Sequence, residues 1–378
     1  MNNHVEAIVV GAGPAGLASA KCLNDVGVSP LVLEKEESVG SVWRKHYDRL
    51  HLHTPRNLSA LPGLAIPRAA GNYPTRDDVV AYFDRYAATF NIKPKFAEKV
   101  LSIKPQGSLW QVTTSRGAYQ SPFVIVGTGW ASFPNRPPLP QEKTFRGQII
   151  HSSAYKNPLP YKGKRVLVVG FGNSGAEIAL DLAEHGVDVG LSVRSPVNIL
   201  PRELFGISVL RFAIAQSFLS PKFADILNAP LLRLVLGKPE SYGLTKSPKG
   251  ALQTIHEDGK IPVLDVGTCK MIKQGKIATY GGVTNLNSNE VEFTDGRKAQ
   301  FDCIIMATGF TPNLPSLLPA NANLFNAKGQ PHLSDGPAAT TGLYFLGAKP
   351  VATGELRELA RGAKRIAANI KIQQKAER

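Results

Sequence analysis

Two glycine-rich segments have the residue types and spacing of a phosphate-binding loop. The first, GAGPAG, runs from Gly11 to Gly16, and the second, GFGNSG, runs from Gly170 to Gly175. A turn without side chains lets a pyrophosphate approach backbone N–H groups, and the positive end of a following helix attracts it. Each segment therefore predicts a dinucleotide-binding site. The structural alternative is a glycine turn that only packs a helix on a strand.

The flanking patterns supply the strand and the helix that such a loop needs. Apolar runs at 7–10 and 166–169 precede the two loops, and helical patterns at 17–26 and 176–185 follow them. A strand, a tight turn and a helix form the start of a dinucleotide-binding βαβ unit. The expected fold class is α/β, with two Rossmann-like dinucleotide-binding domains.

The second strands of the two units end differently, which suggests different dinucleotides. The first ends in Glu34, 18 positions after Gly16 (34 − 16), where a carboxylate accepts hydrogen bonds from an adenosine ribose. The second runs into Arg194 and Ser195 without an acid, and a guanidinium suits a 2′-phosphate. We therefore expect FAD at the first loop and NADPH at the second. A solvated surface arginine is the alternative for Arg194.

A third motif lies between the loops and carries a resemblance. Phe145, Gly147, His151 and Tyr155 have the spacing FxGxxxHxxxY. With two dinucleotide loops, this motif resembles the class B flavin-dependent monooxygenases, the flavin-containing and Baeyer–Villiger group. Three further segments, GNSG at 172–175, SYGLTKSPKG at 241–250 and GKIPVLDVGT at 259–268, resemble the plant YUCCA enzymes of auxin synthesis.

The resemblance adds candidate residues near the flavin. Gly40 to Arg44 (GSVWR) resembles the family's GGxW segment, although Trp43 is also typical of an ordinary buried aromatic. Gly127 to Gly129 resembles the family's ATG motif, where the chain leaves the FAD domain. Thr54 resembles the threonine of a Thr-Asn pair in flavin-containing monooxygenases, but Pro55 follows it here. This departure counts against a typical amine or sulfide oxygenase.

The candidate residues form two sets. For FAD they are Gly11, Gly13, Pro14, Ala15, Gly16, Glu34, Lys35, Val42, Trp43, Thr54 and Gly129. For NADPH they are Gly170, Gly172, Asn173, Ser174, Gly175, Arg194 and Ser195. We assign no catalytic side chain, and we expect Phe145, Gly147, His151 and Tyr155 to have a structural and gating role.

The order of motifs predicts a discontinuous FAD domain at residues 1–157 and 290–378, around an NADPH domain at 158–289. The ATGF segment at 307–310 resembles the sequence by which the family's chains re-enter the FAD domain. An apolar insertion at about 204–237 is interrupted by charges, so it lacks the roughly 20 continuous apolar residues of a membrane span. We expect paired helices that wall an apolar substrate path; attachment to a membrane surface is the alternative.

Shorter patterns predict further elements. Thr75 to Phe90 has an N-cap threonine and apolar residues three to four apart, typical of an amphipathic helix. Strands are expected at 109–114, 123–126, 276–280, 291–293, 301–306 and 343–346. A helix is expected at 355–370, followed by a frayed polar tail at 371–378.

Composition excludes several classes of protein. The chain has 378 residues, enough for two domains, and its formal net charge of +15 is spread without a Lys/Arg block, which argues against nucleic-acid binding. Three distant cysteines form no CxxC pair, which argues against dithiol reductases and for a reduced, cytoplasmic protein. The first strand begins too early for a signal peptide. His51 and His53 have no further ligand at a suitable spacing, so no metal site is expected.

The resemblance implies a monooxygenase whose flavin carries the chemistry. NADPH would reduce FAD, O₂ would add, and a C4a-(hydro)peroxyflavin would transfer one oxygen atom to an apolar or aromatic small molecule. With a 2-oxo acid such as indole-3-pyruvate, CO₂ would leave and indole-3-acetate would form. The alternatives are an N- or S-oxygenating flavin-containing monooxygenase, and a non-oxygenating NADPH oxidase or redox flavoprotein.

Overall fold

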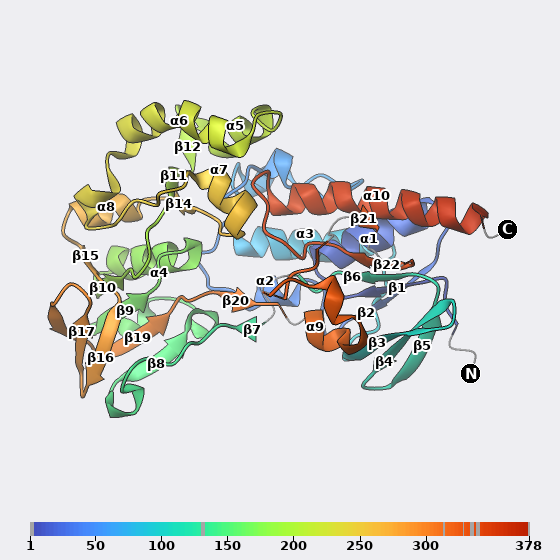
Figure 1. The fold of residues 1–378 in the computed structure, drawn as a ribbon, viewed down its shortest axis with the longest axis horizontal. Helices are drawn as coiled ribbons and strands as arrows, with labels where there is room; N and C mark the ends of the chain where they lie inside the picture. Colours follow the sequence, from blue (N-terminus) through green and yellow to red (C-terminus); the bar gives the residue numbers. More distant parts are fainter. Residues whose placement is uncertain are drawn as a thin grey trace. The chain divides into compact units, whose positions relative to one another are not determined.

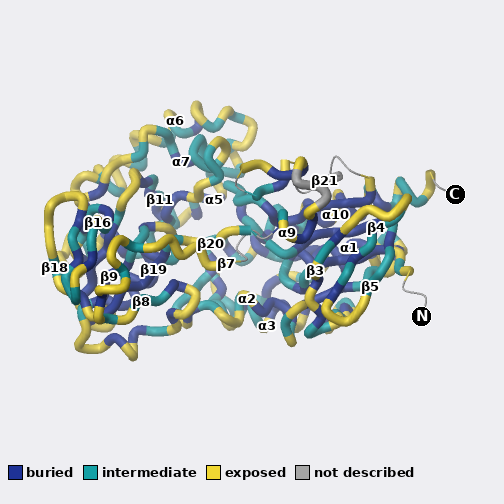
Figure 2. The backbone as a smooth tube through the Cα atoms, turned by 60° about the horizontal axis from the view of Figure 1, so that its bottom comes forward, coloured by how far each residue is buried: buried dark blue, intermediate teal, exposed yellow. Residues whose placement is uncertain are grey.

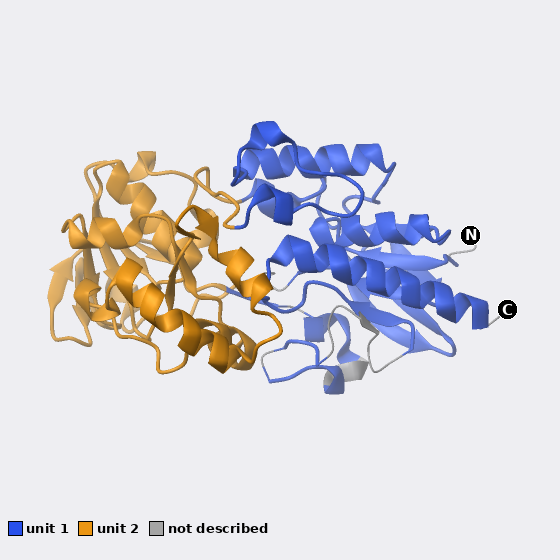
Figure 3. Ribbon diagram, turned by 90° about the horizontal axis from the view of Figure 1, so that it is seen from above, with its two compact units in different colours: residues 1–45, 54–133, 310–378 blue, residues 46–53, 134–309 orange. Residues whose placement is uncertain are grey.

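The computed structural model describes residues 4–129, 133–312, 314–327, 329–332, 336–337 and 341–376. These residues form two compact units (Figure 3). Unit 1 comprises residues 1–45, 54–133 and 310–378, and unit 2 comprises 46–53 and 134–309. Both are α/β units built on a mainly parallel sheet, in agreement with the expected fold class.

Unit 1 is built on a five-stranded sheet with strand order β2-β1-β6-β22-β21 (Figure 1). The first four strands are parallel, and β21 is antiparallel to β22. Helix α10 packs along α1, and the antiparallel meander β3-β4-β5 forms a separate three-stranded sheet. The elements of unit 1 are β1 (Ala7–Val10), α1 (Pro14–Asp25), β2 (Pro30–Leu33), α2 (Ser41–Arg44), α3 (Arg76–Thr89), β3 (Val100–Gln106), β4 (Leu109–Thr114), β5 (Gly117–Ser121), β6 (Val124–Val126), α9 (Leu314–Leu317), β21 (Gly336–Pro337), β22 (Leu343–Phe345) and α10 (Glu355–Ala376).

The core of unit 1 follows from the alternation of side chains along β1. Ile8 and Val10 pack with Trp110 and Phe345 in one apolar cluster. Ala7 and Val9 point to the opposite face and are also buried. A parallel strand that is covered on both faces has a continuous run of apolar residues. This is why the sequence AIVV at 7–10 predicts a strand so clearly.

Unit 2 is built on an entirely parallel sheet with strand order β15-β10-β9-β19-β8. Along β9, Val166 and Val168 pack in one apolar cluster, whereas Leu167 packs with Phe301 in a second cluster on the other face. The elements of unit 2 are β8 (Gln148–His151), β9 (Arg165–Val169), α4 (Asn173–Glu184), β10 (Asp188–Ser192), β11 (Ile199–Pro201), β12 (Glu203–Leu204), β13 (Ile207–Ser208), α5 (Val209–Ala215), α6 (Pro221–Leu236), α7 (Ala251–Gln253), β14 (Val263–Asp265), α8 (Thr268–Lys273), β15 (Ile277–Tyr280), β16 (Val283–Asn287), β17 (Glu290–Phe293), β18 (Lys298–Gln300) and β19 (Cys303–Met306).

The boundaries of the units differ from the predicted domain boundaries. Residues 134–157 and 290–309 were expected in the FAD domain, but they lie in unit 2. The reason is strand pairing, because β19 hydrogen-bonds to β9 and β8 extends the same sheet. The chain passes between units near the short strands β7 (Phe133–Pro134) and β20 (Phe310–Thr311), close to the GTG and ATGF segments.

The apolar insertion forms two helices, α5 and α6, as expected. Most of α6 is exposed or half-buried, in contrast to the buried central strands (Figure 2). Its exposed apolar side chains include Phe223, Ile226, Leu227 and Leu234. Among the helices of the described residues, none is long and apolar enough to cross a bilayer.

Other expected elements are present with shifted ends. Thr75 caps α3 by accepting a hydrogen bond from the Asp78 backbone N–H at 3.1 Å, and the Asp78 carboxylate accepts from Thr75 N–H at 3.0 Å. The expectation of a frayed tail is wrong up to Ala376, because α10 continues to that residue. Lysine, glutamine and alanine favour helix, and Gln373 donates a hydrogen bond to Asn369 one turn earlier.

Candidate functional site

The three glycines of the first loop have three different functions. Gly11 has a φ of +101°, and a Cβ there would lie 2.9 Å from the Gly127 carbonyl oxygen. A Cβ on Gly16 would lie 1.8 Å from the Gly11 carbonyl oxygen, so that glycine is needed where helix α1 packs on its loop. A Cβ on Gly13 would meet no heavy atom of the described residues within 4 Å. The protein itself does not require a glycine at position 13, so its missing side chain suits a ligand.

The second loop repeats this division of roles. Gly170 has a φ of +107°, and its Cβ would lie 2.6 Å from the Ala307 carbonyl oxygen. A Cβ on Gly175 would lie 2.1 Å from the Gly170 carbonyl oxygen. A Cβ on Gly172 would again meet nothing within 4 Å. Each loop thus leaves an open space beside its middle glycine, Gly13 or Gly172, at the start of a twelve-residue helix; we call this space the cradle. The residues present fit a pyrophosphate in both units.

In each unit, an equivalent backbone hydrogen bond joins the first glycine of the loop to the last residue of the second strand. These two bonds show which positions of the two units correspond. Gly11 N–H donates to the Leu33 carbonyl oxygen at 2.8 Å, and Gly170 N–H donates to that of Ser192 at 2.9 Å. Glu34 directly follows Leu33, whereas Val193 occupies the corresponding position after Ser192. The acid of the first unit is therefore absent from the second.

The Glu34 carboxylate is buried beside the first loop. It accepts hydrogen bonds from Ala12 N–H at 2.6 Å and from Glu36 N–H at 3.0 Å. A carboxylate has about four lone-pair positions, so capacity remains for the hydroxyl groups of a ribose. Lys35 follows Glu34 and is exposed.

Arg194 lies one position beyond Val193 and is exposed, as is Ser195. Its guanidinium makes no hydrogen bond or ion pair within the part of the chain that the structure describes. A cation without a protein partner, at the strand end where the other unit has an acid, suits a 2′-phosphate. This geometry supports the sequence-based assignment of NADPH to the second loop.

The GSVWR segment also lies beside the first loop. Gly40 N–H donates to the Ala12 carbonyl oxygen at 3.0 Å. Helix α2 follows, with Val42 exposed and the Trp43 ring edge-on to Phe83 at a centroid distance of 6.2 Å. The structure therefore brings Val42 and Trp43 into the neighbourhood of Gly11–Gly16, together with the Gly127–Gly129 segment that follows β6.

Thr54 is tied locally rather than to the loop. Its hydroxyl group lies 2.6 Å from that of Ser59, within hydrogen-bond distance, and its carbonyl oxygen accepts a hydrogen bond from the same Ser59 hydroxyl group at 3.4 Å. A flavin contact of Thr54 stays a prediction from the resemblance.

One YUCCA-like segment, GKIPVLDVGT, holds the first turn of α4, which begins inside another, GNSG. The Asn173 side chain accepts a hydrogen bond from Leu264 N–H at 2.7 Å, and the Thr268 hydroxyl group donates to the Ala176 carbonyl oxygen at 2.9 Å. Both donors belong to GKIPVLDVGT. In SYGLTKSPKG, a Cβ on Gly250 would lie 2.2 Å from the carboxylate of Asp225, which holds the start of α7. GKIPVLDVGT thus has a structural function at the second loop, and SYGLTKSPKG has one at the start of α7.

Two acids on α4 were missed by the sequence analysis. Glu177 and Asp181 lie four residues apart and are 3% and 4% exposed, among the buried apolar residues in the middle of the helix. Glu177 pairs with His53, and the buried Tyr47 hydroxyl group hydrogen-bonds both Glu177 and Ser174 of the loop. Burial, followed by the charge of Glu177, raises the pKa of Tyr47. The signal available in the sequence was the i, i+4 pair of acids on a buried helix face.

The FxGxxxHxxxY residues lie inside unit 2. Phe145 packs in the second apolar cluster, and a Cβ on Gly147 would lie 2.4 Å from the Asp302 carbonyl oxygen. The fully buried Tyr155 donates from its hydroxyl group to the Asp181 carboxylate at 2.7 Å, and burial raises its pKa. These contacts support a structural function for the motif.

His151 joins the end of β8 to the segment where the chain leaves unit 2. Its Nδ1 accepts from Ser153 N–H at 3.1 Å, and its Nε2 hydrogen donates to the Gly309 carbonyl oxygen at 3.0 Å. This arrangement requires the neutral imidazole. Burial lowers the pKa of His151 below 6.5; the nearby charge of Arg136 also lowers it, although the Gly309 hydrogen bond raises it.

The lowered pKa of His151 predicts a pH-dependent stability. Below pH 6.5 the unfolded chain binds a proton at this position more readily than the folded chain. The stabilisation of the folded state by neutral His151 is therefore complete above pH 6.5. The free energy of unfolding should fall as the pH decreases below that value. In denaturant titrations at several pH values, His151→Gln should show a shallower decrease than the parent protein. The same slope in both proteins would contradict this function of His151.

The cysteines give no dithiol centre. Cys22, Cys269 and Cys303 are all free and buried. Burial raises the pKa of Cys22 and of Cys303 to about 11, and it also raises that of Cys269. These thiols are poor nucleophiles at neutral pH. Among the described residues, no group of three or more His, Cys, Asp or Glu is placed to hold a metal ion.

Comparisons with known proteins agree with this geometry. The family model described as pyridine nucleotide-disulphide oxidoreductase matches residues 8–223. Indole-3-pyruvate monooxygenase YUCCA1 of Oryza sativa subsp. japonica is 40% identical over 328 residues, which cover 85% of this chain and 81% of the relative. Probable indole-3-pyruvate monooxygenase YUCCA4 of Arabidopsis thaliana is 38% identical over 348 residues, covering 90% and 84%.

Solved structures share the fold. The flavin-containing monooxygenase from Stenotrophomonas maltophilia gives a TM-score of 0.76 at 22% identity, covering 99% of this chain and 100% of that one. Cyclohexanone monooxygenase from Rhodococcus sp. Phi1, solved with NADP⁺, gives 0.73 at 18% identity, covering 99% and 85%. Two dinucleotide-type α/β units in one chain are thus the architecture of known flavin monooxygenases.

Proposed function

The chain belongs to the YUCCA-type flavin-dependent monooxygenases, and from this membership we propose that it converts indole-3-pyruvate to indole-3-acetate with NADPH and O₂. The enzyme uses FAD and NADPH as cofactors. The observation that carries the choice of substrate is the 40% identity to a rice protein of that activity, over 85% of this chain. The reaction belongs to auxin synthesis.

The two open cradles support one dinucleotide in each unit, and the different residues after β2 and β10 support the division of cofactors between the units. In unit 1, Gly13 leaves room for the pyrophosphate of FAD, and the Glu34 carboxylate would accept hydrogen bonds from the adenosine ribose. In unit 2, Gly172 leaves room for the pyrophosphate of NADPH, and Arg194 would bind its 2′-phosphate. When bound, the flavin supplies hydride acceptance and oxygen activation.

The proposed reaction balances without a catalytic side chain. NADPH supplies two electrons as a hydride, solvent supplies one proton, and O₂ supplies two oxygen atoms. One oxygen atom forms a bond to the keto carbon of the substrate, the bond from that carbon to the carboxylate breaks, and CO₂ leaves. The second oxygen atom leaves as water. The chain's own residues bind the two cofactors and orient them, and we propose that this takes place in the cytoplasm.

The assignment is tested by comparing substrates with the purified, FAD-loaded protein. We expect indole-3-pyruvate to accelerate NADPH oxidation and indole-3-acetate to appear. An amine, a sulfide and cyclohexanone are the comparison substrates, and Gly172→Ala is the matched control that lacks the NADPH cradle. Faster turnover with the amine or the sulfide would assign the chain to N- or S-oxygenation instead.

A further inference from the structure

The end of strand β10, just before Arg194, is fixed by the segment that follows β15. Val193 N–H donates to the Tyr280 carbonyl oxygen at 2.9 Å, and the Ser192 hydroxyl group donates to the Gly281 carbonyl oxygen at 2.7 Å. The two chain segments therefore leave the sheet together. Any shift of residues 280–282 would move the backbone that carries Arg194.

Gly282 lies directly against the stem of Arg194. A Cβ on Gly282 would lie 3.0 Å from Cγ and 3.2 Å from Cβ of Arg194. The backbone of Gly282 does not have the positive φ that would by itself require glycine. The missing side chain thus gives room to the arginine, whose guanidinium is otherwise without a partner among the described residues.

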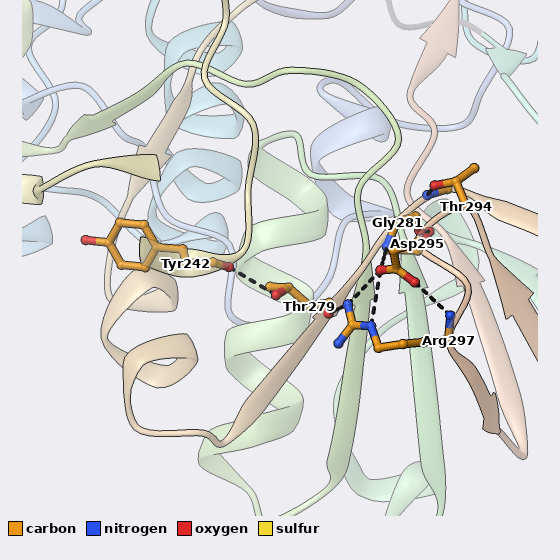
Figure 4. A network of polar contacts seen from close by, with 8 residues as sticks. Tyr242, Thr279, Gly281, Thr294, Asp295 and Arg297 are labelled. Carbon is orange, nitrogen blue, oxygen red and sulfur yellow. Dashed lines mark hydrogen bonds and ion pairs between the residues drawn. The ribbon is translucent and has the colours of Figure 1, made fainter. Parts of the chain in front are cut away.

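A turn between β17 and β18 holds Gly281 and Gly282 in place (Figure 4). The Asp295 carboxylate accepts a hydrogen bond from Gly281 N–H at 2.8 Å. The Thr294 hydroxyl group accepts from Gly282 N–H at 2.9 Å, and Thr294 N–H donates to the Gly282 carbonyl oxygen at 2.8 Å. Three hydrogen bonds thus join two consecutive residues to this turn.

Arg297 completes the network by holding Asp295. Its guanidinium donates to the Asp295 carboxylate at 2.7 and 3.2 Å and to the Thr279 carbonyl oxygen. It also lies over the Tyr280 ring, 4.6 Å from the centroid. The hydrogen bond from Arg297 lowers the pKa of Asp295 to about 2, so the carboxylate is charged at neutral pH.

We propose that Asp295 is a positioning residue for the 2′-phosphate of NADPH, acting through Gly281 and Gly282 on Arg194. The carboxylate does not touch the coenzyme; it fixes the glycine pair against which the Arg194 side chain rests. Asp295 thereby contributes to the preference for NADPH over NADH. The inference rests on the proposed function, in which Arg194 binds that phosphate.

The test uses two variants that disturb the network at different points. Asp295→Ala removes the acceptor for Gly281 N–H, and Gly282→Ala places a methyl group against Arg194. We expect each to raise KM for NADPH about tenfold, a typical effect of disturbing a positioning network. The kcat value and KM for NADH should stay within about twofold, because neither variant touches the parts that the two coenzymes share.

A matched control and a double variant separate positioning from a general structural effect. Glu292 pairs with Lys298 at 2.5 Å on the same two strands without contacting Gly281 or Gly282, so Glu292→Gln should leave KM for NADPH unchanged. In an Arg194→Ala background, Asp295→Ala should raise KM for NADPH no further.

The outcomes distinguish this inference from the function on which it rests. If Arg194→Ala keeps the preference for NADPH, the 2′-phosphate assignment fails and the inference fails with it. If Arg194→Ala loses the preference but Gly282→Ala and Asp295→Ala keep it, the inference alone is overturned. An equal effect of Glu292→Gln would also overturn it. If Asp295→Ala does not fold, Gly282→Ala decides the question.

Discussion

Replacing Gly13 by alanine is expected to give a folded but colourless protein. The position has extended backbone, with φ of −76° and ψ of −173°, and a Cβ there would meet nothing within 4 Å in the part of the chain that the structure describes. The methyl group would instead occupy the cradle of the FAD pyrophosphate. Overpacking of this kind costs about 3 kcal/mol at the upper end of its usual range, which weakens binding roughly 100-fold. The ratio of absorbance at 450 and 280 nm measures the flavin content.

The control is the equivalent change in the other unit. Gly172 has similarly extended backbone and a similarly open Cβ position, so Gly172→Ala should also fold. That variant should stay yellow but be reduced by NADPH only at much higher coenzyme concentrations. A yellow Gly13→Ala protein with full flavin content would contradict the assignment of FAD to the first loop. Gly16→Ala, by contrast, should impair folding itself, since its Cβ would lie 1.8 Å from a carbonyl oxygen.

Replacing Arg194 by alanine is expected to remove most of the preference for NADPH over NADH. The guanidinium has no partner among the described residues and stands where unit 1 has the Glu34 segment. A hydrogen bond to a charged group contributes about 2 kcal/mol, so KM for NADPH should rise roughly 30-fold. KM for NADH should hardly change, since NADH lacks the 2′-phosphate. Steady-state kinetics with both coenzymes give the two values.

The matching control removes a positive charge from the opposite end of the strands of the same sheet. Lys276 is exposed and directly precedes β15, at the end of the strands away from the loop. Lys276→Ala lowers the net charge by the same amount as Arg194→Ala. It should leave both KM values within about twofold, because salt screens an exposed charge far from the coenzyme. Equal losses for NADPH and NADH in Arg194→Ala would show that this arginine does not distinguish the coenzymes.

Local patterns predicted the elements around the two loops well. The apolar runs, the glycine spacing and the helices that follow agree with β1 and α1, and with β9 and α4, to within a few residues. The Thr75 N-cap of α3 is confirmed together with its capping box. These features depend on residues close together in the chain, which is why one sequence is enough to predict them.

The domain boundaries could not be read from local patterns. Cys303 and Ile304 pair with Val166 and Leu167, although about 137 positions separate them, and only this pairing places β19 in unit 2. The ATGF segment at 307–310 lies where unit 2 ends and unit 1 resumes, and the strand before it, β19, lies in unit 2. Hydrophobic periodicity shows that a segment is a strand, and it says nothing about which sheet the strand joins.

The contacts that hold the second loop and the backbone around Arg194 could not be predicted from the sequence either. Tyr47 and His53 come from a segment far from Glu177 in the chain, and Asp295 lies about 100 positions after Arg194. An aspartate before a glycine, as at 295–296, is typical of any turn between strands. Only the folded chain shows that this carboxylate also holds Gly281.

The most direct test of the proposed oxygen transfer measures the stoichiometry of the reaction under ¹⁸O₂. The purified yellow protein is supplied with NADPH and indole-3-pyruvate, and NADPH consumption, H₂O₂ and indole-3-acetate are measured in the same sample. The proposed function predicts about one indole-3-acetate per NADPH, little H₂O₂, and one ¹⁸O atom in the product carboxylate. NADPH consumption with H₂O₂ as the sole product, or indole-3-acetate without ¹⁸O, would contradict the proposed oxygen transfer.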